Sequence, residues 1–103
     1  MLAQLSANDF LPWIGKTCRA SADGLSFELV IESVDEKTHQ KPPSNVRAPF
    51  LILFKSSQEP SFHYGLFTLE MDDNLSIPGI YIERTLPPHG GDPNAAYYQS
   101  VFN

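Results

Sequence analysis

The chain has 103 residues, the size of one ordinary domain, and 42% of them are hydrophobic, so it can bury a core without disulfides or metal. Its formal net charge is −5, and its seven Lys and Arg residues are scattered along the chain rather than clustered. Because phosphate recognition needs clustered basic residues, this composition argues against nucleic acid as a partner.

Cys18 is the only cysteine in the sequence, so no intramolecular disulfide can form. We interpret it as a small buried apolar side chain, since the sequence places no evident base beside it. The N-terminal residues lack the basic segment and long apolar run of a signal peptide, and no stretch has the length of a transmembrane helix. The sequence therefore predicts a soluble, cytoplasmic protein with no membrane partner.

The N-terminal segment is predicted to form a short helix and then a plug. Ser6 is a favourable N-cap for a helix over residues 7–11, and Asp9 completes a capping-box-like pattern. Pro12 opposes a long continuation of this helix. The neighbouring apolar residues are too dense to be left in water, so we expect them to lie across one open end of a β-structure; they are Phe10, Leu11, Trp13 and Ile14.

Two antiparallel strands are predicted next, over residues 16–20 and 25–32, and Asp23-Gly24 between them is typical of a tight hairpin turn. In the second strand apolar residues alternate with mostly polar ones, which predicts one buried face and one solvated face. Residues 36–46 are polar and rich in turn-forming residues, so we expect a long solvated loop that is mobile or contacts a partner.

The run Phe50-Leu51-Ile52-Leu53-Phe54 is apolar at every position. Alternate side chains of a strand point to opposite faces, so this run is predicted to be covered on both sides. It is too short for an ordinary helix, and Pro49 favours an extended residue before it. We interpret it as the central strand of the domain.

Three more strands are predicted, over residues 62–71, 77–86 and 96–103, with an exposed loop at 87–94. Gly65 inside the first of them indicates a bulge or a close backbone approach. Pro78 cannot donate a ladder hydrogen bond, so we expect it at the start of its strand or at an edge.

The strand at residues 96–103 is aromatic and lacks a basic residue, which makes it costly to leave as a free edge. We expect it to be paired inside one protomer, closing a barrel, or to be paired with a second copy. The strand at residues 16–20 carries Lys16 and Arg19 and is a safer edge. The oligomeric state predicted from the sequence is thus a monomer or a homodimer.

Together these elements predict an all-β fold in a single β-domain over residues 1–103. Its six strands, connected mostly in sequence order, form an antiparallel meander curled into a barrel or half-barrel, with a short N-terminal helix. A two-sheet sandwich of the same strands is the alternative architecture.

No catalytic, cofactor or metal constellation is evident in the sequence. The three histidines have no metal-ligand spacing, and they are His39, His63 and His89. Asp72-Asp73-Asn74 is interpreted as a turn rather than a calcium loop, and Gly90-Gly91 follows no phosphate-loop pattern. The acidic residues at outward strand positions are interpreted as solvated, and they are Glu28, Glu32 and Glu83. We therefore expect no cofactor, no metal and no enzymatic activity.

Four tyrosines could line a ligand site, and they are Tyr64, Tyr81, Tyr97 and Tyr98. The favoured interpretation is that they divide between the core and the sheet surface.

The C-terminal residues Tyr98-Gln99-Ser100-Val101-Phe102-Asn103 resemble the Tyr-x-x-Val-Phe-Asn ending of a family of small bacterial proteins known only as a domain of unknown function. Other landmarks of that family occur in order along the chain: Phe10 to Gly15, Phe50 to Lys55, Tyr64-Gly65-x-Phe67-x-Leu69-Glu70, and Ile80-Tyr81-Ile82 with Pro87 after it. Its members are often encoded beside phage tail-collar-like proteins. The resemblance implies no catalytic residues and favours an accessory role near tail-like particles.

Two functional hypotheses follow. The first is a non-enzymatic structural or protein-binding module, accessory to a phage-tail-like assembly, whose partner is a protein. The alternative is a small β-barrel that binds an apolar or aromatic ligand, or a modest enzyme built on such a cavity.

Overall fold

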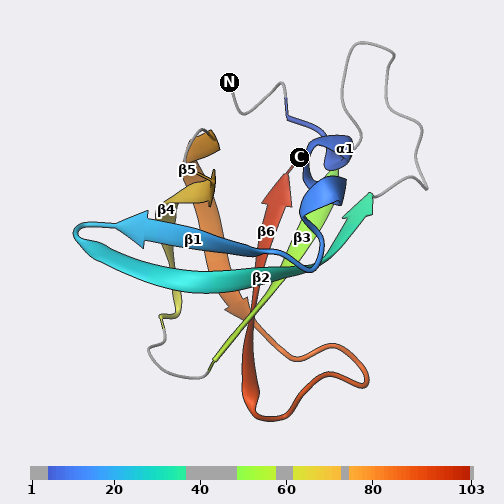
Figure 1. Ribbon diagram of the computed structural model, residues 1–103. Helices are drawn as coiled ribbons and strands as arrows, with labels where there is room; N and C mark the ends of the chain where they lie inside the picture. The colour runs from blue at the N-terminus through green and yellow to red at the C-terminus, as the bar shows by residue number, and fades with distance from the viewer. Residues whose placement is uncertain (1–4, 37–48, 58–61, 73–74, 103) are drawn as a thin grey trace.

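The computed structural model describes residues 5–36, 49–57, 62–72 and 75–102 (Figure 1). Six antiparallel strands form a closed barrel with one short helix at the N-terminus, which confirms the predicted all-β fold and decides between the alternatives in favour of a complete barrel. The elements are α1 (Ala7–Phe10), the 3-10 turn η2 (Leu11–Trp13), β1 (Thr17–Ala22), β2 (Leu25–Glu36), β3 (Phe50–Ser57), β4 (Tyr64–Asp72), β5 (Leu75–Thr85) and β6 (Ala95–Phe102).

The barrel consists of two three-stranded meanders joined edge to edge. The strand order around it is β1-β2-β3-β6-β5-β4, so β3 and β4 are consecutive in sequence but are not neighbours. The two joints are β3 with β6 and β1 with β4. The terminal strand β6 therefore pairs on both sides within one chain. This confirms the expectation that it is paired inside one protomer and closes the barrel. The idea that residues 16–20 form a free edge is wrong, because β1 pairs with β2 and with β4.

The interior of the barrel is filled by alternate side chains of the strands. The largest fully buried side chains are Tyr98, Phe10, Phe50, Phe54, Leu29, Ile31, Ile52, Leu69, Ile80 and Ile82. In β3 the inward residues Phe50, Ile52 and Phe54 are buried, whereas Leu51 and Leu53 point outward and are only half-buried. The expected full cover on both sides of β3 is therefore wrong, because a strand in a barrel wall faces the interior on one side only.

The N-terminal helix closes one end of the barrel, beside the end of β6 (Figure 1). Its start is stabilised by a capping box, in which the backbone N–H of Ser6 donates to Asp9 Oδ2 at 2.8 Å. Phe10 is 1% exposed and lies 5.8 Å from the ring of Phe50 and 5.7 Å from the ring of Phe102. The predicted plug is thus confirmed for Phe10.

Leu11 and Ile14, by contrast, are exposed, so the expectation that the whole apolar group is covered is wrong. The helical segment is one turn of α-helix followed by a 3-10 turn, and a segment this short presents a single inward face.

A tight turn and a bulge are among the local features that shape the strands. The hairpin turn predicted at Asp23-Gly24 is confirmed by their positive φ angles of 52° and 81°. In the β4–β5 ladder Phe67 pairs with Ile80 and Leu69 with Ile77, so β5 has one extra residue at Pro78-Gly79, where Gly79 has φ 73°.

Pro78 is therefore inside β5 rather than at its start. It is tolerated there because it lies in a bulge and because this part of β5 pairs with β4 alone; the ladder to β6 includes only Glu83, Arg84 and Thr85. At Gly65 the register with β5 is regular, so the structure shows no bulge there, and the close approach is to a side chain rather than to a backbone. A Cβ added there would lie 3.1 Å from the ring of Phe67.

The long loop predicted over residues 36–46 falls outside the described residues, except for Glu36, which ends β2. The loop at residues 86–94 is exposed along most of its length, as predicted. It is nevertheless attached to β6, because the backbone N–H of Asp92 donates to the Tyr97 hydroxyl at 2.8 Å. The Asp92 carboxylate also lies 3.6 Å from Lys55 Nζ on β3.

The structure predicts different stability costs for two adjacent apolar residues of the plug. Phe10→Ala should lower the free energy of unfolding by about 3–5 kcal/mol, because it leaves a cavity between Phe50 and Phe102. Leu11→Ala, at a position that is 46% exposed, should lower it by less than about 1 kcal/mol. Urea denaturation monitored by circular dichroism measures both, and equal costs would contradict the plug.

Candidate functional site

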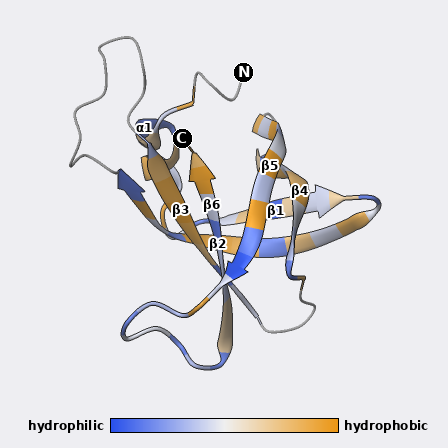
Figure 2. Ribbon diagram, turned by 180° about the vertical axis from the view of Figure 1, so that it is seen from behind, coloured by the Kyte–Doolittle hydropathy of each residue, from blue (hydrophilic) through white to orange (hydrophobic). Residues whose placement is uncertain are grey.

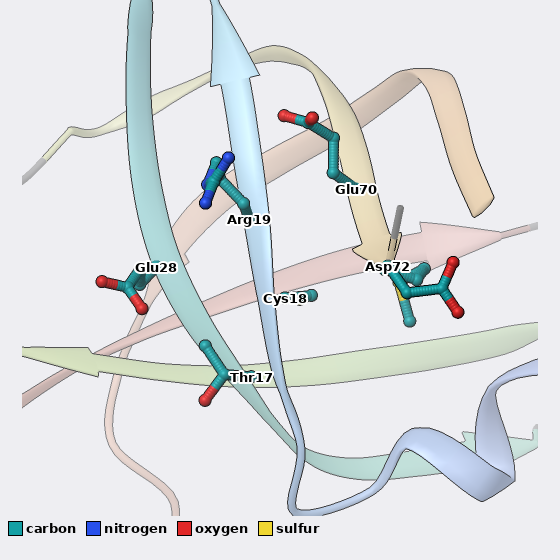
Figure 3. A pocket seen from close by; sticks show the side chains of 7 residues that line it. Thr17, Cys18, Arg19, Glu28, Glu70 and Asp72 are labelled. Atoms are coloured by element: carbon teal, nitrogen blue, oxygen red, sulfur yellow. The ribbon is translucent and has the colours of Figure 1, made fainter. Parts of the chain in front are cut away.

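A shallow polar pocket of about 170 Å³ lies where β1 runs between β2 and β4 (Figure 3). Arg19 on β1 is directly opposite Glu28 on β2 and Glu70 on β4, so one cation lies between two carboxylates on the outer wall. Among the described residues no salt bridge joins these three side chains. A surface row of this kind, without a buried polar group, is typical of a solvated sheet face.

Cys18 contributes to the same pocket but is buried. Burial removes the thiol from water and thereby raises the pKa of Cys18 to about 12. At neutral pH the side chain is a protonated thiol, and only the thiolate is a good nucleophile. The interpretation of Cys18 as a small buried apolar side chain is confirmed.

The remaining chemistry-bearing residues are dispersed. His63 and His89 are exposed and lie in different segments, and Glu28 and Glu32 are exposed on β2. No group of three or more His, Cys, Asp or Glu side chains in the described part of the chain is arranged to hold a metal ion. His39, Asp73 and Asn74 lie outside the described residues. The described residues thus offer scattered polar side chains rather than a reaction centre.

The four tyrosines divide between core and surface, as predicted. Tyr98 is buried with its ring stacked on Phe62 at 4.2 Å, and its hydroxyl accepts from the Phe62 backbone N–H at 3.4 Å. Tyr97 is buried under the loop that contains Asp92. Tyr64 and Tyr81 are exposed on neighbouring strands, with ring centroids 6.3 Å apart.

These two tyrosines belong to a set of exposed apolar side chains on the outer wall, which we call the outer apolar face. Its members are Tyr64 (69% exposed), Leu66 (66%), Tyr81 (46%) and Val101 (51%), from the adjacent strands β4, β5 and β6. Figure 2 shows hydrophobic colour over the middle of β5, a stretch that also contains the buried Ile80 and Ile82, and hydrophilic colour at its end. Isolated exposed apolar residues are ordinary on proteins, but a group on adjacent strands is typical of an interaction surface.

The register of β4 and β5 places exposed apolar side chains beside one another. Leu66 is directly opposite Tyr81 in the β4–β5 ladder. The β5–β6 ladder ends at Glu83 and Gln99, and Val101 lies two residues beyond that end on β6. Ser100 keeps β5 and β6 together beyond the ladder, because its Oγ donates to the Tyr81 carbonyl at 2.8 Å.

Sequence reasoning did not identify the outer apolar face. The signal was available in the alternation of β4 and β5, where apolar residues occupy outward positions that are usually polar. That signal does not say which strands are neighbours, and the contribution of β6 depends on the order of strands in the barrel.

A second apolar feature is a groove of about 330 Å³ between the N-terminal helical segment and the end of the β4–β5 hairpin. Its lining is apolar apart from Asp9, and consists of Leu5, Asp9, Phe10, Trp13, Met71, Leu75 and Ile77. The Asp9 carboxylate already accepts the hydrogen bond of the helix cap. The groove therefore has the size of a small ligand site but few polar groups to orient a ligand.

Comparison with known proteins identifies the family. The model of the family described as Domain of unknown function (DUF6916) matches residues 5–102, so the chain belongs to this family. No curated protein and no solved structure shows a significant match to the chain. The expectation of a family of unknown function is thus confirmed, whereas the C-terminal motif and the gene neighbourhood stay predictions. No helix in the described residues is long and apolar enough to cross a membrane.

The state of Cys18 gives a prediction that chemical labelling can check. Iodoacetamide at mildly alkaline pH should modify the folded protein much more slowly than the urea-unfolded protein, because the folded state buries a protonated thiol. Rapid modification of the folded protein would contradict the buried position.

The raised pKa of Cys18 also predicts how the stability of the protein changes with pH. Above pH 9 the unfolded thiol ionises while the folded thiol does not, so the parent loses stability as pH rises from its ordinary pKa of 9.0 towards about 12. The difference in unfolding free energy between the parent and Cys18→Ala should therefore become smaller as pH rises from 9.0 towards about 12. Below pH 9 the difference should be constant.

Proposed function

We propose that this member of the DUF6916 family is a non-enzymatic protein-binding module that contacts its partner through the outer apolar face. The observation that supports this most is the exposure of Tyr64, Leu66 and Tyr81 beside one another on β4 and β5, with Val101 exposed on the neighbouring strand β6. Tyrosine is enriched at protein interfaces because its ring is large and rigid and its hydroxyl tolerates water.

The shape of the face favours a macromolecule over a small molecule. The face lies on the outside of a barrel wall, where side chains project from the strands instead of surrounding a cavity. Small ligands bind in concave sites that cover most of their surface. A protein partner can cover an exposed wall, and each apolar Å² that it removes from water contributes roughly 25 cal/mol.

The absence of an activity is part of the proposal. It is supported by the protonated state of Cys18 and by the exposed positions of His63 and His89. A catalytic site needs a nucleophile or base held against a partner group that activates it. In the pockets of the outer wall, the Lys55 ammonium lies 3.6 Å from the Asp92 carboxylate, but both side chains are partly exposed, as in an ordinary surface ion pair.

We further propose that the partner is a component of a phage-tail-like assembly. Support for this step comes from the family resemblance and the gene neighbourhood it implies. Co-purification with a neighbour-encoded tail-like protein is the expected result, and repeated native purification of the chain alone would count against it.

The face can be tested with a matched pair of variants. Leu66→Ser should reduce recovery of the partner in a pull-down at least about tenfold, since it removes an apolar side chain from the contact. Leu25→Ser is the control, because Leu25 is also exposed (64%) but lies at the tip of the β1–β2 hairpin. Both variants should unfold within about 1 kcal/mol of the parent. Equal recovery with both would refute the proposed face.

A second candidate function is supported by the apolar groove, which could hold an apolar or aromatic ligand. Trp13 lines this groove and is the only tryptophan, so its fluorescence reports directly on occupation. Titration with anilinonaphthalene sulfonate should give a saturable change in Trp13 emission if the groove binds such ligands. The change should disappear in Leu75→Asp and persist in Leu66→Ser, and a linear, unsaturable response would remove this candidate.

A further inference from the structure

We infer that the partner of the outer apolar face presents Lys or Arg side chains around an apolar centre, and that it is not a second copy of this chain. The inference rests on the proposed function, because it concerns the partner of the same face. It starts from the charges that surround Tyr64, Leu66, Tyr81 and Val101.

The strands that carry the face are acidic. β4, β5 and β6 are described completely and include Glu70, Asp72 and Glu83 but only one basic residue, Arg84. Arg84 lies over the ring of Tyr98, with 5.6 Å between its Cζ and the ring centroid, and Tyr98 belongs to the core. The only cation of the three face strands is therefore turned to a ring that is not part of the face.

The neighbouring strands β3 and β1 do not offset the acidic charge of β4, β5 and β6. On the β3 side, Leu51 is opposite Val101, and Asp35 of β2 is opposite Leu51. Lys55 on β3 lies 3.6 Å from the Asp92 carboxylate, which offsets its charge. On the β1 side, Arg19 is opposite Glu70 and lies between Glu70 and Glu28. Among the described residues, Lys55 and Arg19 are thus each matched by at least one carboxylate, while Glu83 is opposite Tyr64 and Gln99 and has no cation opposite it.

Glu83 is the carboxylate best placed to contact a partner. It is directly opposite Tyr64 in the β4–β5 ladder, so it borders the aromatic part of the face. Its Oε1 accepts from Gln99 Nε2 at 3.0 Å, which holds the side chain in one orientation. A charge that is already oriented loses less entropy when a Lys or Arg pairs with it.

The tyrosine rings favour the same kind of partner. Tyr64 and Tyr81 are exposed with 42° between their ring planes, so a side chain can approach the ring faces. The face of an aromatic ring attracts a cation, with a contribution of about 0.5–1 kcal/mol at an exposed site. A Lys or Arg near Glu83 would therefore meet a carboxylate and aromatic rings together.

A second copy of the chain lacks this complementarity. Each copy has a net charge of −5, and a symmetric contact through the face would bring two sets of carboxylates together. Like charges brought together in an interface oppose association. We therefore expect the isolated chain to be a monomer at low salt.

The inference can be tested with two peptide probes that share the same alternating Leu and Tyr residues. In one peptide the residues between them are Lys, and in the other they are Glu. Titration of the ¹⁵N-labelled chain should show the Lys peptide binding at least about tenfold more tightly, shifting the amides of Tyr64, Leu66, Tyr81 and Val101. Added salt should weaken this binding, because it screens the charges.

Variants then locate the charge that is responsible. Glu83→Gln should lower the affinity for the Lys peptide several-fold, whereas Glu32→Gln should leave it unchanged. Glu32 is an exposed carboxylate on β2, three strands away from β5 in the barrel order in either direction, so it is a matched control. Equal affinity for the two peptides, or the same loss in both variants, would overturn the inference.

The outcomes also separate this inference from the proposed function. If Leu66→Ser abolishes peptide or partner binding but peptide charge has no effect, only the inference fails. If Leu66→Ser changes neither peptide binding nor partner binding, the proposed face itself is wrong. Light scattering over a concentration series provides the remaining outcome: a dimer that Leu66→Ser disrupts would identify the second copy as the partner and overturn the inference.

Discussion

The pairing of β3 with β6 is the interaction on which the rest of this structure depends. The two strands pair along their whole length, from Phe50 with Phe102 to Ser57 with Ala95. The rings of Phe50 and Phe102 stack at 4.5 Å, and Phe10 of the helix packs against both. This ladder joins the two meanders, brings the end of the chain into the wall and provides the surface on which the helix closes the barrel. The two strands are far apart in sequence, so pairing them costs chain-closure entropy. The free energy of the apolar burial that follows must offset this cost.

The same ladder explains why the opposite side of β6 is less regular. β6 follows β3 throughout but pairs with β5 only at Glu83, Arg84 and Thr85. Beyond these residues a side chain replaces the ladder, as Ser100 Oγ donates to the Tyr81 carbonyl. The part of β5 that pairs with β4 alone is the part that contains Pro78 and the bulge at Gly79. Pro78 cannot donate a ladder hydrogen bond, and it is therefore accommodated where β5 pairs with a strand on one side only.

The interior of the barrel is filled by packed side chains. The inward residues of β3 and β5 are packed around Leu29, Ile31 and Leu69, and Cys18 lies among them as a neutral thiol. What distinguishes the outer wall is the group of exposed apolar side chains on β4, β5 and β6, bordered by Glu83 opposite Tyr64. In the proposed function, apolar contact with the outer apolar face would provide affinity, and the neighbouring Glu83 carboxylate would provide selectivity between partners.

The sequence by itself determined the local structure of this protein. The capping residues Ser6 and Asp9, the Asp23-Gly24 turn and the alternation in β2 act over a few residues, so each could be predicted from its own segment. The burial of Cys18 and the division of the tyrosines also followed from residue type. The order of strands around the barrel was decided by tertiary structure, because it depends on which distant edges pair, and no local pattern specifies that choice. The outer apolar face depends on the same choice: Leu66 and Val101 are far apart in sequence, and only the strand order and register bring them to the same wall.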